Sequence, residues 1–246
     1  MPSPHFLWVT RSSPYAFLTG HHLRAAGHEP LIAPVLTIQP VSHEPLAKPP
    51  DALVFTSTHG VAHHLFDPEM AEVPVYAVGQ RTARTARDAG YRNVASADGN
   101  VSDLYGLIIA CAARGSSIVH LGAAEPAGNL ARDLVGQGFS ARHVAVYESL
   151  DVPSSTLRPA LAALPWIDGV LVHSPKAGRR LARFLMECGD LWHGTAFCIS
   201  HAAAEPISAV TTAPVLVAQF PTENALIVLV GESGKHAPKA ARTARA

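Results

Sequence analysis

The chain has 246 residues, 48% of them hydrophobic, which is enough for one large domain or for two ordinary domains with buried cores. Its 19 Lys and Arg residues balance 19 Asp and Glu residues, so the composition excludes a generally basic surface for nucleic acids or acidic membranes. An anionic ligand would have to be held locally.

The cysteines and the N-terminal sequence predict the compartment. Cys111, Cys188 and Cys198 are an odd number without CxxC spacing, which favours a reducing compartment over a disulfide scaffold. The apolar run before Thr10 is too short for an export signal, and no later run approaches a membrane span. We therefore expect a cytoplasmic protein with no membrane and no nucleic-acid partner.

Short apolar runs alternate with helix-length segments along the chain. In chain order the runs that precede a predicted helix are "HFLWVT" (5–10), "ALVFTS" (52–57), "VYAVG" (75–79), "SIVHLG" (117–122), "GVLVHS" (169–174) and "AFCIS" (196–200). Continuous apolar strands separated by helices indicate parallel sheets that are covered on both faces. The predicted fold class is α/β.

The two halves of the sequence repeat one another. "WVTRSS" aligns with "VHLGAA", "DALVFTS" with "DGVLVHS", and "VYAVGQRTA" with "FCISHAAAE", in the same order. The repeat covers most of the chain, and such internal similarity is typical of duplicated structural units. It predicts two similar α/β domains rather than one long sheet.

Hydroxyl side chains recur where a predicted strand gives way to a helix. Ser57, Thr82, Ser174 and Ser200 fall at equivalent places in the two halves. A residue of this type can cap the helix, and the open backbone N–H groups there favour an anion. Two domains facing each other would line one cleft with such groups, which suits a polyanionic organic ligand; the alternative is that the residues only cap their helices.

Seven motifs follow one another over nearly the whole chain: "VTR" (9–11), Gly27–Ile38, "DALVFTS" (51–57), Val75–Ala83, Leu134–Tyr147, "DGVLVHSP" (168–175) and Pro221–Leu226. Each motif alone is weak. Together and in this order they resemble the uroporphyrinogen-III synthase family of tetrapyrrole biosynthesis.

The resemblance implies two similar domains, each a parallel β-sheet flanked by helices, joined by a two-strand linker. Residues 1–38 with 151–235 would form one domain, and residues 39–150 would form the inserted second domain. Residues 236–246 are expected to be a disordered basic tail. The Pro-rich segments 38–50 and 148–159 permit a hinge at both crossings, so we expect the domains to move relative to each other.

The resemblance also implies the reaction, which is cyclisation of the linear tetrapyrrole hydroxymethylbilane to uroporphyrinogen III with loss of water and inversion of ring D. It implies a monomeric lyase that needs no cofactor and no metal, and it leaves room for handover of the bilane from the enzyme that forms it. Tyr147 of the "V-x-V-Y" strand is the expected proton donor, since a phenol is protonated at neutral pH. The expected substrate-binding residues are Thr10, Arg11, Ser57, Thr82, Gly122, Ser174 and Ser200.

Four positions depart from the family pattern. Leu121 and Asn129 stand where basic residues are usual, His173 replaces a usual Thr, and Ser200 replaces a usual Gly. These departures keep open a second class, a non-catalytic two-lobed binding or sensor protein for a tetrapyrrole or another polycarboxylate.

One further pattern concerns histidine. His59 and His63 have the i, i+4 spacing of helical metal ligands, but no nearby motif completes such a site. They are expected to be exposed helix residues.

Overall fold

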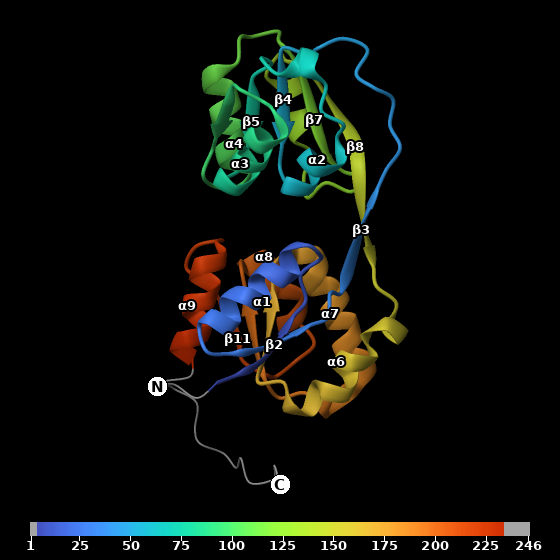
Figure 1. Ribbon diagram of the computed structural model, residues 1–246, viewed down its shortest axis with the longest axis vertical. Coiled ribbons are helices and arrows are strands. Elements are labelled where there is room, and N and C mark those ends of the chain that lie inside the picture. The colour runs from blue at the N-terminus through green and yellow to red at the C-terminus, as the bar shows by residue number, and fades with distance from the viewer. Residues whose placement is uncertain (1–3, 234–246) are drawn as a thin grey trace. The chain divides into compact units, whose positions relative to one another are not determined.

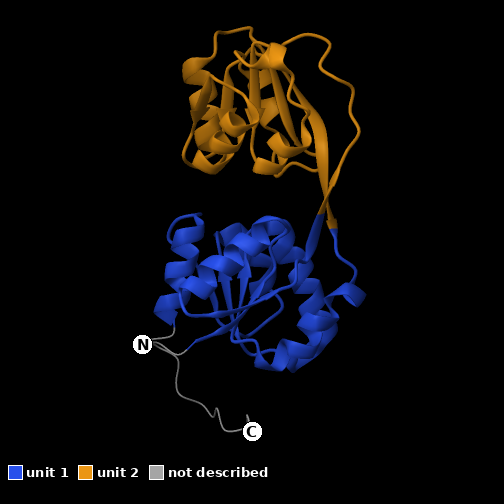
Figure 2. Cartoon of the chain, viewed as in Figure 1, with its two compact units in different colours: residues 1–37, 151–246 blue, residues 38–150 orange. Residues whose placement is uncertain are grey.

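The computed structural model describes residues 4–233, and the chain forms two compact units (Figure 1). Unit 1 comprises residues 1–37 and 151–246, and unit 2 comprises residues 38–150 (Figure 2). The chain passes between the units within β3 (Leu36–Pro40) and at the end of β8 (Ser140–Asp151). The predicted basic tail, residues 236–246, lies outside the described residues.

Unit 1 contains a five-stranded sheet in the order β11-β10-β9-β1-β2, and its strand pairings are parallel. The strands are β1 (Phe6–Val9), β2 (Glu29–Ile32), β9 (Gly169–Val172), β10 (Thr195–Cys198) and β11 (Val215–Val217). The helices are α1 (Tyr15–Ala25), α6 (Arg158–Ala163), α7 (Pro175–Cys188), α8 (His201–Ser208) and α9 (Glu223–Ser233).

Unit 2 contains a six-stranded sheet in the order β3-β8-β7-β4-β5-β6, in which β4 to β8 pair in parallel. Besides β3 and β8, its strands are β4 (Ala52–Phe55), β5 (Val75–Ala77), β6 (Val94–Ser96) and β7 (Ser117–Ala123). The helices are α2 (Thr58–His63), α3 (Gln80–Ala89), α4 (Val101–Cys111) and α5 (Leu130–Gly136).

Helices cover both faces of each sheet, which explains why the strands are apolar throughout (Figure 1). In unit 1 the side chains of Leu7 and Val9 pack with α1 and α9, whereas Trp8 packs with α7 on the other face. In unit 2 Leu53 and Phe55 pack with α2 and α3, whereas Val54 packs with α4. The α/β prediction is confirmed.

The strand orders of the two units correspond under the sequence repeat. The repeat pairs the segment of β1 with that of β7, β9 with β4, and β10 with β5. With these pairs the order β11-β10-β9-β1-β2 matches β6-β5-β4-β7-β8 strand for strand. Duplicated sequence therefore occupies equivalent places in two similar sheets.

Local sequence explains several helix ends. Asn100 and Asp103 form a reciprocal capping box at the start of α4, and Gly90 adopts φ = 119° at the end of α3. The small side chains Thr82, Ala83 and Ala86 face the core of unit 2 from α3, while the arginines of this helix are exposed. Within residues 4–233, no helix is long and apolar enough to cross a lipid bilayer.

Candidate functional site

The candidate site residues gather at the carboxyl ends of the parallel strands, where open α/β sheets bind ligands. In unit 2, Ser57 follows β4 and is the N-cap of α2, and its Oγ accepts a hydrogen bond from the backbone N–H of His59 at 3.2 Å. The Ser57 side chain also lies close enough to the Tyr147 hydroxyl to lower the pKa of the phenol. The cap and the predicted proton donor therefore form one polar pair.

A β-bulge directs the Tyr147 side chain toward α2. Gly122 pairs with Ala145, but the next residue, Ala123, pairs with Tyr147, so Val146 is an extra residue in β8. An inserted residue reverses the alternation of side chains beyond it. Val146 and Tyr147 consequently both belong to the core on the α2 face.

Two imidazoles flank Tyr147. The ring centroid of His59 lies 5.5 Å and that of His63 lies 6.0 Å from the centroid of the Tyr147 ring, and the two imidazoles are stacked 6.2 Å apart. Both histidines are half-buried, which corrects the expectation that they are exposed. Burial raises the pKa of the Tyr147 phenol, and the nearby Ser57 side chain acts in the opposite direction.

A second group of polar side chains, linked by hydrogen bonds, lies on the opposite face of the same sheet. His120 Nε2 lies 3.0 Å from Thr56 Oγ1, and His120 Nδ1 lies 3.2 Å from His143 Nδ1. Burial, with the nearby His143, lowers the pKa of His120 to about 4, so this imidazole is neutral at pH 7. Gly122 leaves room for the pair, because a Cβ there would lie 3.0 Å from His120 Nε2. Gly122 is itself buried and serves this packing.

Another neutral histidine lies in the core beside α2. His64 is 8% exposed, and neither ring nitrogen has a hydrogen-bond partner among residues 4–233. Burial and the stacked ring of His43 lower the pKa of His64 to about 4, with Asp67 acting in the opposite direction.

Thr82 does not occupy the position of a capping residue. The N-cap of α3 is Gly79, and Thr82 is the third residue of the helix, with 5% of its surface exposed. Sequence alignment of the two halves placed a hydroxyl near this helix start, but the helix begins earlier. Thr82 is a core residue rather than a second Ser57.

Thr10 is also a buried residue, in unit 1. Its side chain is fully buried, and its Oγ1 donates a hydrogen bond to the carbonyl oxygen of Leu171 at 2.6 Å. This bond connects the end of β1 to β9. The Thr10 hydroxyl therefore has a structural partner within unit 1, and its role in substrate binding stays a prediction.

Arg11 belongs to a buried ionic network. Its Nη1 lies 2.7 Å from Glu223 Oε2, and its guanidinium lies 5.0 Å from the centre of the Tyr15 ring. His173 Nε2 lies 3.2 Å from the same Glu223 oxygen. Burial alone would raise the pKa of Glu223, but His173, Thr19 and Arg11 together lower it to about 2. At neutral pH the Glu223 carboxylate thus compensates the charge of Arg11.

Ser174 and Ser200 are true N-caps at the ends of β9 and β10. Ser174 Oγ accepts from the Ala177 N–H at 3.1 Å, and Ser200 Oγ accepts from the Ala203 N–H at 3.3 Å. The two capped helices, α7 and α8, pack closely, because a Cβ on Gly178 would lie 2.5 Å from the carbonyl oxygen of Ala203. An accepting hydroxyl keeps its own hydrogen, so both serines can donate to a carboxylate.

Two sets of residues therefore emerge. Unit 2 brings together Ser57 and Tyr147 with the imidazoles of α2, and unit 1 brings Arg11 together with Glu223 and His173.

No group of three or more His, Cys, Asp or Glu side chains that could hold a metal ion occurs in the described part of the chain. Sequence reasoning missed Glu223, although this residue lies within the Pro221–Leu226 motif.

Comparison with known proteins is consistent across two kinds of search. The family model described as Uroporphyrinogen-III synthase HemD matches residues 19–228. The structure of uroporphyrinogen-III synthetase from Helicobacter pylori has a TM-score of 0.62 and 20% identity, covering 94% of this chain and 99% of that chain. A mutant uroporphyrinogen III synthase from the extremely thermophilic bacterium Thermus thermophilus has a TM-score of 0.60 and 18% identity, covering 94% and 98%. At these identities the structural matches show the fold alone, and no curated protein matches the sequence.

Proposed function

Since this chain belongs to the uroporphyrinogen-III synthase family, we propose that it cyclises hydroxymethylbilane to uroporphyrinogen III, with loss of water and inversion of ring D. Membership of the family makes it an enzyme of tetrapyrrole biosynthesis, a lyase in the broad sense, with a small tetrapyrrole as substrate. The observation that carries the finer proposal is the pairing of Tyr147 with Ser57 on the face of unit 2 that α2 covers.

The first chemical step is departure of the terminal hydroxyl group, which leaves an electron-poor azafulvene. A hydrogen bond from the Tyr147 phenol to that hydroxyl would assist its departure. Ser57 fixes the phenol, because its own position is held by the cap bond to His59 N–H. A substituted carbon of the terminal ring then attacks, and a spiro intermediate rearranges to invert the ring. Holding the flexible bilane in the geometry for this attack is a major part of the rate.

The substrate is a polycarboxylate, with acetate and propionate arms on every ring. We propose that the hydroxyl hydrogens of Ser174 and Ser200 donate to such carboxylates in unit 1. Arg11 is less suited to bind a substrate carboxylate, because the Glu223 carboxylate, 2.7 Å away, already compensates its charge. The proposed steps, elimination of water and carbon–carbon bond formation, exchange no electrons with an external partner, so the proposal needs no cofactor.

We further propose that the protein works as a cytoplasmic monomer that receives the unstable bilane from the enzyme that forms it. All the residues named above belong to one chain, which supports a monomer. Light scattering across a hundredfold concentration range tests this: a constant mass near 25.9 kDa is expected, and a concentration-dependent doubling would overturn it.

The function is tested by isomer analysis. Purified protein is given fresh hydroxymethylbilane, the reaction is stopped with acid and oxidised, and the uroporphyrin isomers are separated. Without an enzyme the bilane closes to the type I isomer, so a predominance of type III is expected. Type I alone from folded protein would refute the proposal and would favour a binding or sensor protein for a tetrapyrrole or another polycarboxylate.

A further inference from the structure

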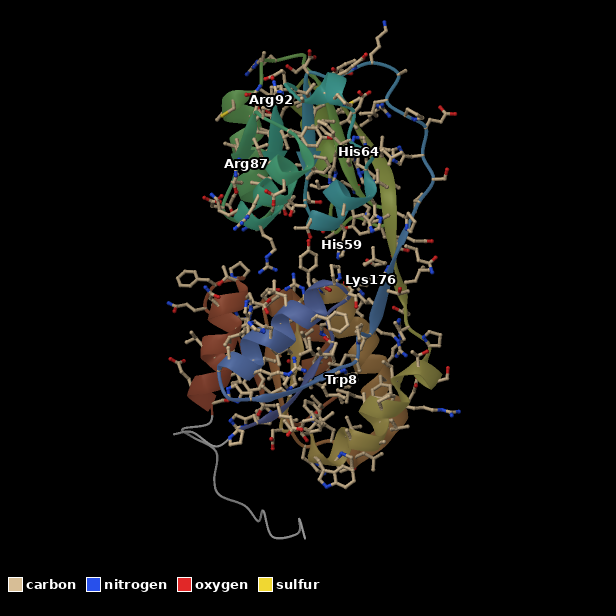
Figure 3. All side chains as sticks on the ribbon, viewed as in Figure 1. Trp8, His59, His64, Arg87, Arg92 and Lys176 are labelled. Carbon is tan, nitrogen blue, oxygen red and sulfur yellow. The ribbon has the colours of Figure 1, made fainter. Side chains whose placement is uncertain are left out.

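The stacked imidazoles of α2 have no role in the reaction as described so far. His59, which belongs to α2 (Figure 3), lies one helical turn from His63. Both rings contact the Tyr147 ring, with centroids at 5.5 and 6.0 Å. Both imidazole side chains are half-buried, whereas Tyr147 is 7% exposed, so the imidazoles are the more accessible members of this group. The packed rings fix these positions.

The phenol is a weak proton donor for the leaving hydroxyl. An unperturbed tyrosine has a pKa of about 10, and the burial of Tyr147 raises it further. Imidazole is the side chain that most often acts as a general acid in enzymes. The candidate acids nearest Tyr147 are the two histidines whose rings contact it.

We propose that the His59 and His63 imidazole pair supplies the proton that leaves with the hydroxyl group, while Tyr147 hydrogen-bonds and orients that hydroxyl. This inference rests on the proposed synthase function and deepens it by assigning the acid. It also gives unit 2 a source of positive charge beside the site, where the expected basic residues are replaced by Leu121 and Asn129.

The proton balance closes over one turnover. An imidazolium N–H proton goes to the hydroxyl oxygen, the C–O bond breaks with its electron pair on that oxygen, and water leaves. The pyrrole carries the resulting positive charge as an azafulvenium cation. When the macrocycle closes, the ring carbon that forms the last bond loses one proton, and the neutral imidazole takes it back.

Charged groups on the elements packed against α2 influence the pair. Helix α3 and strands β7 and β8 carry the titratable side chains Arg81, Arg84, Arg87, Asp88, His120, Arg142, His143, Tyr147, Glu148 and Asp151. Of these, Arg84 pairs with Asp88 and His120 is neutral at pH 7. Arg87 donates a hydrogen bond to the carbonyl oxygen of Val94.

The test uses five variants, each made in the full chain. His59→Gln, His63→Gln and the double variant are compared with Tyr147→Phe and with His21→Gln, a matched control on an exposed position of α1. The readout is kcat/KM for type III formation from pH 6 to 9. We expect about a tenfold loss in each single His variant, about 10²-fold or more in the double variant, and no change in the control.

The pH dependence separates acid catalysis from packing. Wild-type kcat/KM should fall as the pH rises through the imidazolium pKa, and this limb should persist in Tyr147→Phe but vanish in the double His variant. Added imidazole should partly restore type III formation in a His59→Ala, His63→Ala variant, which a structural role would not allow. A double variant within twofold of wild type, or a falling limb lost in Tyr147→Phe, would overturn the inference. If wild-type protein forms no type III isomer, the proposed function fails instead.

Discussion

The carboxyl edges of the two sheets carry the same strand order but different chemistry. In unit 1 the polar side chains form a charged network, in which Glu223 holds Arg11 and His173. In unit 2 the side chains that surround Ser57 and Tyr147 are aromatic or imidazole groups, and the deeper histidines are neutral. A duplicated fold thus offers equivalent positions, and the side chains placed there decide whether an edge carries a charged network or a cluster of aromatic and imidazole groups.

The largest expected effect is a loss of the stability of unit 2 at acid pH. His64 and His120 have pKa values of about 4, below the ordinary 6.5, so the unfolded chain binds their protons first. Their contribution to stability is complete above pH 6.5 and is lost as the pH falls to about 4, by up to about 3 kcal/mol for each. Unit 2 should therefore lose stability at a higher pH than unit 1.

Separate probes can follow the two units during this acid titration. All three tryptophans belong to unit 1, so their fluorescence reports on that unit, while hydrogen exchange of residues 38–150 reports on unit 2. His64→Leu replaces a ring without hydrogen-bond partners in the described chain and should remove about half of the pH dependence. An unchanged dependence in this variant would contradict the assignment.

The second effect tests the charged network of unit 1. Glu223→Gln removes the negative charge but keeps the size of the side chain. Arg11 and His173 then lose the carboxylate that they contact. We expect the free energy of unfolding to fall by about 3 kcal/mol in urea titrations followed by tryptophan fluorescence. The pKa of Glu223, about 2, also predicts that wild-type unit 1 loses this contribution as the pH falls from 4.5 to 2. The exposed Glu205→Gln is the control, and equal stability of the two variants would refute the prediction.

The third effect tests the close packing behind Ser174 and Ser200. Gly178→Ala places a methyl group 2.5 Å from the Ala203 carbonyl oxygen, so α7 and α8 must separate. A loss of about 1 to 3 kcal/mol in the free energy of unfolding is expected. Gly106→Ala on α4, where a Cβ would meet nothing within 4 Å, should instead be neutral or slightly stabilising. Equal effects of the two substitutions would show that the packing is looser than described.

The smallest expected effect tests the proposed role of Tyr147 in catalysis. Tyr147→Phe should lower kcat for type III formation about tenfold, about 1.4 kcal/mol in barrier height, because one hydrogen bond to the leaving group is lost. The free energy of unfolding should change by less than about 1 kcal/mol. Tyr91→Phe is a matched control, since the Tyr91 hydroxyl is buried without a hydrogen-bond partner in residues 4–233. Full activity of Tyr147→Phe would remove the phenol from the mechanism.

Much of the architecture could be predicted from local patterns. The strands before Ser57, Ser174 and Ser200 and the capping of their helices follow from apolar runs that end on a hydroxyl residue, a short-range signal. The same patterns did not indicate α4, α6 or α9, whose sequences lack an equally clear apolar run before a cap.

The candidate site was harder to predict, because burial depends on distant partners. Thr10 and Thr82 resemble ligand residues in sequence, yet both are buried in the cores of their units. Arg11 is a plausible carboxylate ligand until Glu223, 212 positions away, is placed 2.7 Å from it. No local pattern carries that information.

By itself, the sequence determined the α/β class, the duplication and the strand ends at which polar groups would gather, because apolar periodicity and capping act over a few neighbouring residues. Only the tertiary structure decided which of these groups meet. A single extra residue in β8 moves Tyr147 to the face that α2 covers, beside His59 and His63. The reason is that side-chain direction in a strand alternates with every residue, so one bulge, set by pairing with β7, decides which partners a side chain can reach.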